Sequence, residues 1–259
     1  MSVQTLPFHL PDVKLEYPGS RKGLAHWYGV NDEKYNRVTT ILDKTVPKPG
    51  LLVWSRRTAL THVAQLVDDH PGRIAKRDLR KYLIAADVEP DRVKDEAADW
   101  GTRAHAAVQA DVESLILGNP PPVPSEEMEP VVEAFRAFTL GRGLTWFASE
   151  LTVYIPYWKV AGTMDAVAMD SNGNWLIMDW KTSKGFYQEQ ALQLGAYAEG
   201  FAHLTGVNPG GAGIVRYPKE HSETSWFEVK WVKDIDAQRR QYGRLVELFH
   251  FLKNPTWQE

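Results

Sequence analysis

The stretch GTMDAVAMDSNGNWLIMDWKTSK, residues 162–184, decides the fold. It contains two apolar runs separated by the polar residues 170–174. Their alternating pattern predicts two strands, and the Asn-Gly pair between them predicts a tight turn. The second strand ends with Asp179 and Lys181, two residues apart and therefore on one face. Burying charged side chains is costly unless something compensates them, so this pair needs a chemical explanation.

The length of the turn decides which residue faces Asp179. A two-residue Asn-Gly turn would place Asp165 opposite Trp180 and facing away from Asp179. A three-residue turn, with Gly173 in the left-handed conformation, would place Asp165 directly opposite Asp179. The pattern leaves both alternatives open, because Gly173 serves either turn. Two facing carboxylates repel unless a cation or proton lies between them, and their hard oxygen atoms suit Mg²⁺ or Mn²⁺.

The rest of the chain predicts an α/β protein with a mixed sheet. Residues 1–30 are rich in turn formers and are expected to be irregular. We expect helices at 51–67, 73–86, 93–117, 126–143 and 187–206 and from Asp234 or Asp236 to 252, and strands at 148–156, 160–170, 174–182, 211–217 and 225–232. The first three strands should form an antiparallel meander. The helix after them should lead to a strand that pairs in parallel.

Composition excludes several classes of site. The chain has 259 residues and no cysteine, which removes disulfides, cysteine-bound zinc and iron–sulfur clusters and fits a cytoplasmic protein. There is no run of apolar residues like a signal peptide or a membrane span, so we expect no membrane partner. Residues 21–103 carry 16 Lys and Arg against 12 Asp and Glu, whereas residues 104–200 carry 5 against 12. A basic third beside an acidic middle suits a surface for anions next to a site for cations, although ordinary fluctuation would explain it too.

Four short motifs in this order carry a resemblance to a known family. They are Gly101-x-x-x-His105, Gly162-x-x-Asp165, Asp179-Trp-Lys181-Thr182 and Gln193-x-x-x-Tyr197. Together they resemble the core of the PD-(D/E)XK nucleases, and specifically the RecB-like exonuclease branch. The segment from residue 38 to residue 59 also resembles RecB-like nucleases of phages. The resemblance implies a restriction-endonuclease-like αβββαβ core with a mixed central sheet flanked by helices and with extra N-terminal helices.

The resemblance also implies a domain organisation and a set of site residues. Residues 1–92 would be an irregular segment and basic helices packing on a nuclease core of residues 93–259, which ends in a hairpin and a helix. The two parts would form one compact unit. Asp165, Asp179 and Lys181 would be catalytic. The metal ligands would be His105, Asp165, Asp179 and the carbonyl of Trp180. Substrate contacts would come from Gln193, Tyr197, Thr182 and Lys184, and from the basic residues Arg56, Arg57 and Arg77. Glu150 would belong to the site or would be a solvated charge at the edge of a strand.

The implied activity is metal-dependent hydrolysis of DNA phosphodiester bonds with Mg²⁺ or Mn²⁺. The branch most often acts as an exonuclease, so the resemblance implies single-stranded or frayed DNA ends as substrate, in replication, recombination or repair. Two alternatives remain: a structure-specific endonuclease with the same site, and a catalytically inert DNA-binding or assembly module. The chain departs from many RecB-like exonucleases in one respect, because those hold an iron–sulfur cluster through four cysteines and this chain has none.

Overall fold

The computed structural model describes residues 3–8, 10–16, 27–69, 72, 76–219 and 226–254, and the side chains of residues 76 and 77 lie outside the description. The chain divides into two compact units, which we call unit 1 (residues 1–46 and 104–259) and unit 2 (residues 47–103). We expected the first 92 residues to form one N-terminal part. The structure instead groups residues 1–46 with the sheet and separates the helices that follow.

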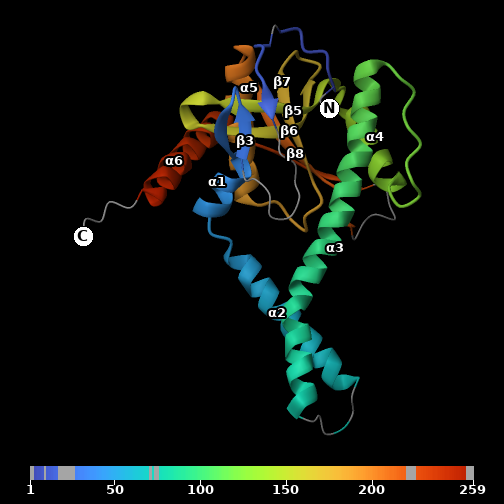
Figure 1. Ribbon diagram of the computed structural model, residues 1–259. Coiled ribbons are helices and arrows are strands. Elements are labelled where there is room, and N and C mark those ends of the chain that lie inside the picture. Colours follow the sequence, from blue (N-terminus) through green and yellow to red (C-terminus); the bar gives the residue numbers. More distant parts are fainter. Residues whose placement is uncertain are drawn as a thin grey trace. The chain divides into compact units, whose positions relative to one another are not determined.

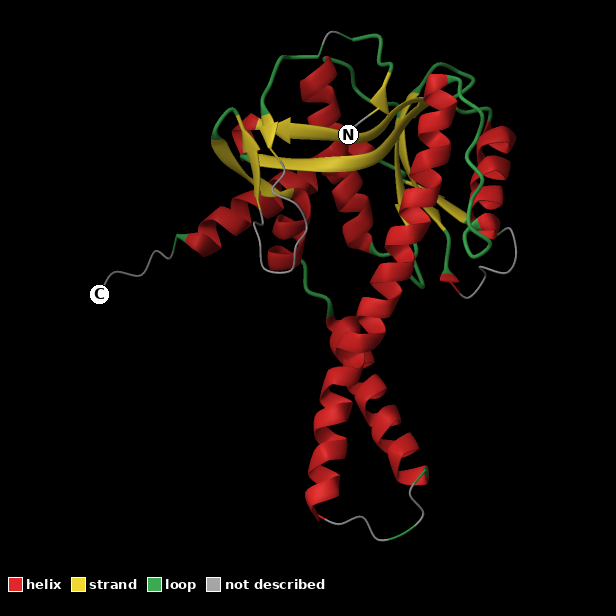
Figure 2. Cartoon of the chain, turned by 45° about the vertical axis from the view of Figure 1, so that its right-hand side comes forward, coloured by secondary structure: helices red, strands yellow, loops and turns green. Residues whose placement is uncertain are grey.

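Unit 1 is built on a mixed sheet, which Figure 2 shows as a strongly curved set of strands. Nine strands are found within the described residues: β1 (Val3–Gln4), β2 (Leu15–Glu16), β3 (Trp27–Val30), β4 (Glu33–Arg37), β5 (Thr145–Ile155), β6 (Val160–Met169), β7 (Trp175–Lys181), β8 (Gly211–Arg216) and β9 (Glu228–Trp231). The order is β2-β3-β4-β6-β7-β8-β9, and β5 pairs with both β1 and β6. The β4–β6 and β7–β8 pairs are parallel, and the other pairs are antiparallel.

The predicted meander and crossover are confirmed. β5, β6 and β7 follow one another in antiparallel pairs, and β8 then joins β7 in parallel after one helix. The expectation of an irregular segment at residues 1–30 was wrong for β1, β2 and β3. These strands are two to four residues long, so their alternation is too short to stand out from a segment rich in turn formers.

Helices α1 (Val38–Thr45), α5 (Gln188–Thr205) and α6 (Ile235–Lys253) pack against one another in unit 1. The hydroxyl of Tyr242 in α6 donates to the carbonyl of Val38 at 3.0 Å, which ties α6 to the start of α1. A side chain at Gly195 of α5 would lie 2.6 Å from the backbone of Gln238, so glycine permits the close approach of α5 and α6.

Helix α4 (Glu129–Arg142) covers the other side of the sheet, and Figure 1 shows α4 and α6 on opposite sides of the strands. The ring of Phe135 in α4 lies 5.5 Å from that of Trp146 and 5.8 Å from that of Trp180. These aromatic contacts anchor α4 to β5 and β7. Gly143 ends the helix with φ of 59°, the left-handed conformation that glycine adopts at the end of a helix.

Unit 2 contains α2 (Pro49–Asp68) and the first part of α3 (Lys76–Leu117). We expected two helices in place of α3, but it runs without interruption through Pro90. A proline removes one helical hydrogen bond. Arg92 forms ion pairs with Glu89 and Glu96, which bridge the turns around the proline and support the helix there. No helix among the described residues is long and apolar enough to cross a membrane.

Candidate active site

The turn between β6 and β7 contains three residues, Ser171, Asn172 and Gly173. The N–H of Asp170 donates to the carbonyl of Asn174 at 3.1 Å, and the N–H of Gly173 donates to the carbonyl of Asp170 at 3.0 Å. Gly173 has φ of 81°, the left-handed conformation that glycine adopts without strain. The three-residue alternative is therefore the one that the chain adopts.

The register set by this turn brings Asp165 to the position opposite Asp179. The β6–β7 pairs run from Met169 with Trp175 to Ala166 with Met178. At the next position along the two strands, Asp165 is opposite Asp179. The regular pairing ends there. Asp165 Oδ2 instead accepts a hydrogen bond from the N–H of Trp180 at 2.6 Å. The Asp165 carboxylate is thus fixed by the backbone of the neighbouring strand.

Asp179 and Lys181 form a buried ion pair at the end of β7. Lys181 Nζ lies 2.5 Å from Asp179 Oδ2, and the Asp179 side chain is only 3% exposed. Burial raises the pKa of Asp179 to about 6; the ammonium of Lys181 opposes that shift, and the charge of Asp165 adds to it. Burial alone would lower the pKa of Lys181, but Asp179 and Asp165 outweigh it and raise that pKa above its usual value. The pair is therefore charged at neutral pH.

His105 lies on the part of α3 that belongs to unit 1. Its Nδ1 atom is 3.7 Å from Asp165 Oδ2, and its side chain is one-third exposed. That distance is short enough for an ion pair but too long for a hydrogen bond. The Gly-x-x-x-His motif thus brings an imidazole to the carboxylate of the Gly-x-x-Asp motif, although the two motifs are some sixty residues apart in the sequence.

Two of the predicted metal ligands, His105 and Asp165, lie beside each other, and a third, Asp179, is paired with Lys181. Within the described residues, no group of three or more His, Asp or Glu side chains converges as a metal site would. The donors nevertheless suit a hard divalent cation. Asp179 Oδ2 is buried, and the Lys181 ammonium lies beside it. Ligation by this set, including the Trp180 carbonyl, stays a prediction.

Glu150 lies in β5 beside these carboxylates and adopts an unusual backbone conformation. Its φ is 52°, which is rare for a residue with a side chain. The neighbouring pairs, Ser149 with Ala166 and Leu151 with Met164, place it opposite Asp165. Burial raises the pKa of Glu150 to about 7, and the charges of Asp165 and Glu113 add to the shift. A carboxyl group in this position is a candidate member of the site rather than a solvated edge charge.

Gln193 and Tyr197 brace this region from α5. Gln193 Nε2 donates to the hydroxyl of Tyr197 at 2.8 Å, and Tyr197 is buried. A Cβ atom at Gly162 would lie 2.8 Å from the Tyr197 ring and 2.9 Å from the side chain of Val38. The glycine of the Gly-x-x-Asp motif is therefore required where β6 passes under α5 and α1.

The family to which the chain belongs follows from comparison with known proteins. The family model described as the PD-(D/E)XK nuclease superfamily matches residues 124–253. The chain belongs to this superfamily. The match includes β6, β7 and α5 with Asp165, Asp179 and Lys181, and it begins after His105. No curated protein matches the chain. A solved structure titled "Crystal structure of SSO0001" is similar, with 15% identity and a TM-score of 0.29 over 58% of this chain and 75% of that one.

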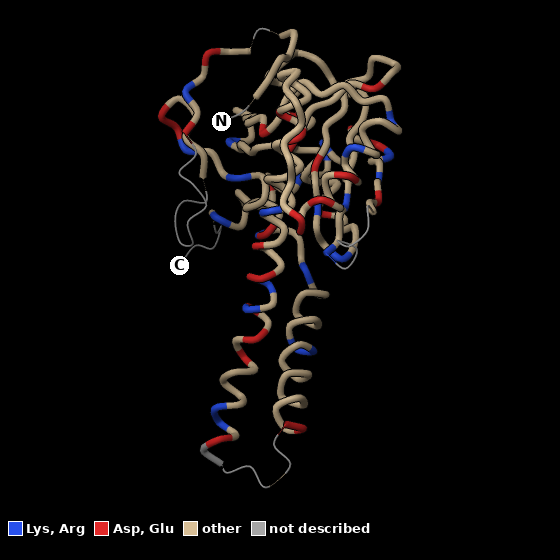
Figure 3. Tube along the Cα trace, turned by 90° about the vertical axis from the view of Figure 1, so that its right-hand side faces the viewer, with Lys and Arg blue, Asp and Glu red and all other residues tan. Residues whose placement is uncertain are grey.

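The other predicted substrate contacts of this PD-(D/E)XK protein lie at two places. Thr182 is half-buried and Lys184 is exposed, directly after Asp179 and Lys181 on β7. Arg56 and Arg57 are exposed on α2 in unit 2, and the side chain of Arg77 lies outside the described residues. Figure 3 shows acidic and basic residues interspersed along the trace of α3. Their contact with DNA stays a prediction.

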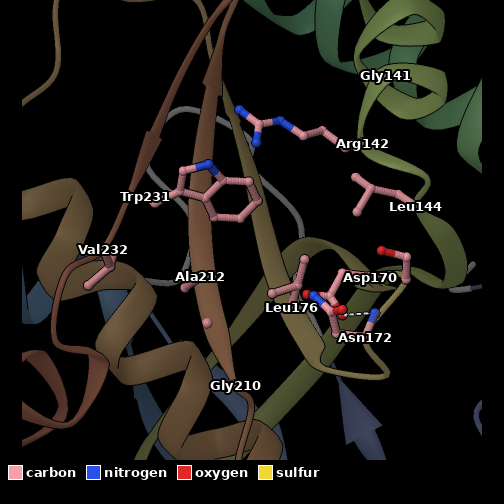
Figure 4. Close-up of a pocket in the computed structure, with 12 residues that line it drawn as sticks. Gly141, Arg142, Leu144, Asp170, Asn172, Leu176, Gly210, Ala212, Trp231 and Val232 are labelled. Atoms are coloured by element: carbon pink, nitrogen blue, oxygen red, sulfur yellow. Dashed lines mark hydrogen bonds between the residues drawn. The ribbon is translucent and has the colours of Figure 1, made fainter.

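A hollow of about 530 Å³ lies at the turn end of β6 and β7 in this PD-(D/E)XK core (Figure 4). Asp170 and Asn172 of the turn line it together with Arg142 and Trp231. The guanidinium of Arg142 is 5.7 Å from the centre of the Trp231 ring. Neither Asp165 nor Asp179 lines this hollow, so we do not assign it to the catalytic site.

A smaller hollow adjoins the site and contains residues that sequence reasoning missed. Tyr28, Arg37 and Thr163 line it together with Glu150 and Tyr197. Thr163 lies inside the Gly-x-x-Asp motif, so its position between Gly162 and Asp165 was a usable signal. Arg37 and Tyr28 come from β4 and β3, where no motif marked them.

Proposed function

We propose that the chain is a metal-dependent DNA nuclease that acts as an exonuclease on single-stranded or frayed ends. One observation carries the proposal: the Asp165 carboxylate is held by the N–H of Trp180, one residue from the buried pair of Asp179 and Lys181. This arrangement supports two aspartates and a lysine acting together, as the family's activity requires. Membership of a nuclease superfamily supports the general class of reaction.

His105, Asp165, Asp179 and the Trp180 carbonyl would hold Mg²⁺ or Mn²⁺. A divalent cation there would polarise the phosphate that is cut and would make water a stronger nucleophile. The chain's own residues have separate tasks. Asp165 and Asp179 place negative oxygens beside the reacting phosphate, so a bound cation would reduce the repulsion between these carboxylates and the substrate. Lys181 keeps its charge, and its ammonium stabilises the negative charge that develops on the phosphate.

The exonuclease mode rests on the RecB-like motifs, in particular Gln193-x-x-x-Tyr197 on α5. In the structure Tyr197 packs against Gly162, three residues before Asp165, and lines the small hollow beside Glu150. A side chain in that place supports a role in positioning the substrate strand. Replication, recombination and repair are the processes in which such an enzyme would act.

The experiment uses end-labelled linear DNA and covalently closed circular DNA, both single- and double-stranded, with Mg²⁺, Mn²⁺ or EDTA. We expect linear DNA to be shortened from its ends with either metal and to stay intact in EDTA. Lys181→Met should lower the rate by about 10²–10³-fold. Lys253→Met, which removes an exposed lysine at the end of α6, is the matched control and should leave the rate unchanged.

Three results would change the conclusion. Cutting of closed circles would replace the exonuclease with an endonuclease that uses the same site. Binding of DNA without any cutting, with both metals present, would identify an inert DNA-binding module. Equal activity of wild type and Lys181→Met would show that the site lies elsewhere.

A further inference from the structure

The small hollow beside Glu150 has a volume of about 230 Å³ and belongs entirely to unit 1. Its lining comes from β3, the end of β4, the start of α1, β5, β6 and α5. We propose that this hollow binds a phosphate group of the substrate strand within two nucleotides of the one that is cut, and that Arg37 is its charged ligand. The inference rests on the proposed nuclease function and adds a substrate subsite to it.

Arg37 is held in place by the backbone of the sheet. It is the last residue of β4, and it pairs in parallel with Ala161 of β6. Its position is thus fixed two residues from Thr163 and four from Asp165 on the strand that carries the catalytic motif. Arg37 is the one cationic side chain that lines the hollow, among the residues that the structure describes. A guanidinium is well suited to a phosphate because it offers two parallel N–H donors.

Hydroxyl groups also line the hollow. The hydroxyl of Tyr28 lies 3.0 Å from Thr163 Oγ1, and Thr152, behind the lining, has its Oγ1 atom 2.9 Å from the same atom. The Tyr28 and Thr163 hydroxyls can redirect their hydrogen atoms toward a phosphate oxygen. Thr39 of α1 adds another hydroxyl to the lining.

The walls are packed closely enough to keep their shape. Gly162 has no room for a side chain between Tyr197 and Val38, and Tyr197 is fixed by its hydrogen bond from Gln193. A binding site works best when such packing holds its groups before the ligand arrives. Glu150 also lines the hollow, so an anion must bind at the side of Arg37 and away from this carboxyl. This requirement gives the phosphate one orientation.

The distance from the hollow to the catalytic aspartate fits one strand of nucleic acid. Thr163 and Asp165 are two residues apart on β6, which is roughly 7 Å along a strand. About 7 Å is the rise of two stacked nucleotides along one DNA strand. A phosphate held between Arg37 and Thr163 would therefore lie one or two nucleotides from the reacting phosphate, and it would be either an internal phosphate or the terminal phosphate of the strand.

The test measures binding rather than cutting. The full chain carrying Lys181→Met is titrated in EDTA with a fluorescent single-stranded oligonucleotide at several salt concentrations. We expect Arg37→Gln to weaken binding about 5- to 10-fold and to reduce the slope of log affinity against log salt by about 0.7, the value of one lost phosphate contact. Arg37→Lys should retain most of the slope. Arg244→Gln, an exposed arginine on α6 outside the hollow, should change neither quantity.

Two arms distinguish the source of the phosphate. Oligonucleotides with a 5′-phosphate, a 3′-phosphate or no terminal phosphate are compared in the Arg37 and Arg37→Gln proteins. An effect confined to one phosphorylated end identifies a terminal phosphate, and an equal effect on all of them identifies an internal one. Unchanged affinity and slope for Arg37→Gln would overturn the inference.

A thermal melt shows whether Arg37→Gln folds. If it does not, Thr39→Val replaces it, because this change removes a hydroxyl from the lining and leaves Arg37 in place. We expect a two- to four-fold loss of affinity for Thr39→Val. Unchanged binding by this second variant would likewise overturn the inference.

The inference and the proposed function can fail separately. If binding depends on Arg37 but the wild type cuts no DNA with Mg²⁺ or Mn²⁺, the phosphate subsite is supported and the nuclease function is contradicted. If the wild type cuts DNA but Arg37→Gln does not change binding, the nuclease function is supported and the subsite is contradicted.

Discussion

Asp165 Oδ2 accepts the backbone N–H of Trp180 at 2.6 Å, at the point where the pairing of β6 and β7 ends. One carboxylate therefore has two roles. It replaces a strand-to-strand contact, which fixes its position, and it presents its charge to His105 and to the buried pair of Asp179 and Lys181. An asparagine can fill the first role but not the second, because its amide oxygen also accepts a hydrogen bond but carries no charge.

Asp165→Asn should therefore separate folding from activity. We expect nuclease activity to fall about 10²-fold or more. Removing one of several neighbouring carboxylates relieves repulsion, so the melting temperature in EDTA should stay the same or rise by a few degrees. Mg²⁺ or Mn²⁺ should raise the melting temperature of the wild type and not that of the variant. A metal-dependent rise of equal size in both proteins would exclude Asp165 as a ligand, and Asp91→Asn is the matched surface control.

Gly195→Ala should destabilise the packing of α5 on α6. The added Cβ atom would lie 2.6 Å from the carbonyl carbon of Gln238, which is backbone and can yield only by moving the helix. We expect a loss of about 1–3 kcal/mol in the free energy of unfolding, measured by urea titration. Gly141→Ala in α4 is the control. It has open space around it, so it should be neutral or stabilising by about 0.5–1 kcal/mol.

Gly173→Ala should destabilise the β6–β7 turn, because φ of 81° strains any residue with a Cβ atom. The expected cost is about 1–2 kcal/mol in the free energy of unfolding. Gly173→Asn should cost less, since asparagine adopts the left-handed conformation more readily. Equal costs for the two variants would show that the conformation of residue 173 does not limit stability.

Arg239→Gln should change how stability depends on pH. Burial alone would raise the pKa of Glu199, but hydrogen bonds from Arg239 (2.6 Å) and Tyr157 outweigh it and lower that pKa below its usual value. A lowered carboxyl pKa contributes stability above the unfolded pKa of about 4.3, and this stability is lost as the pH falls through the folded pKa. We expect Arg239→Gln to cost about 1–3 kcal/mol at pH 7 and clearly less at pH 3.

Urea titrations at pH 7, 5, 4 and 3 measure this difference, with Arg244→Gln as the control for loss of one surface arginine. A gap between wild type and Arg239→Gln that stays constant over these pH values would contradict the role given to Glu199.

The sequence predicted the central elements because each carried a strong local signal. β6 and β7 alternate over many residues, and Gly143 and Gly206 end α4 and α5 in the left-handed conformation. The turn length was open from the sequence, because Gly173 serves either alternative. The pairing of residues 166–169 with 175–178 determines the turn length, and no local sequence pattern predicts that pairing.

Other features depended on contacts between distant segments and could not be read locally. Arg37 reaches β6 only because β4 pairs in parallel with it, across more than a hundred residues of intervening chain. Pro90 is a separate case. Its local preference predicts a break, but the helix continues through it, and the local ion pairs of Arg92 with Glu89 and Glu96 add only about 0.3–0.5 kcal/mol each. Glu150 has a left-handed backbone conformation that glutamate rarely adopts, so its residue type gave no sign of it.

The exposed turn at residues 171–173 gives this protein an unusual sensitivity to chain length. Surface turns are ordinarily the places where a gene can gain or lose a codon at little cost. Loss of Ser171 would leave Asn-Gly, itself a favoured two-residue turn, so the hairpin would still close. Every residue of β6 before the turn would then shift by one position against β7, and Asp165 would turn away from Asp179. A single missing codon, far from any catalytic group, would thus leave a folded chain whose two halves of the site no longer meet.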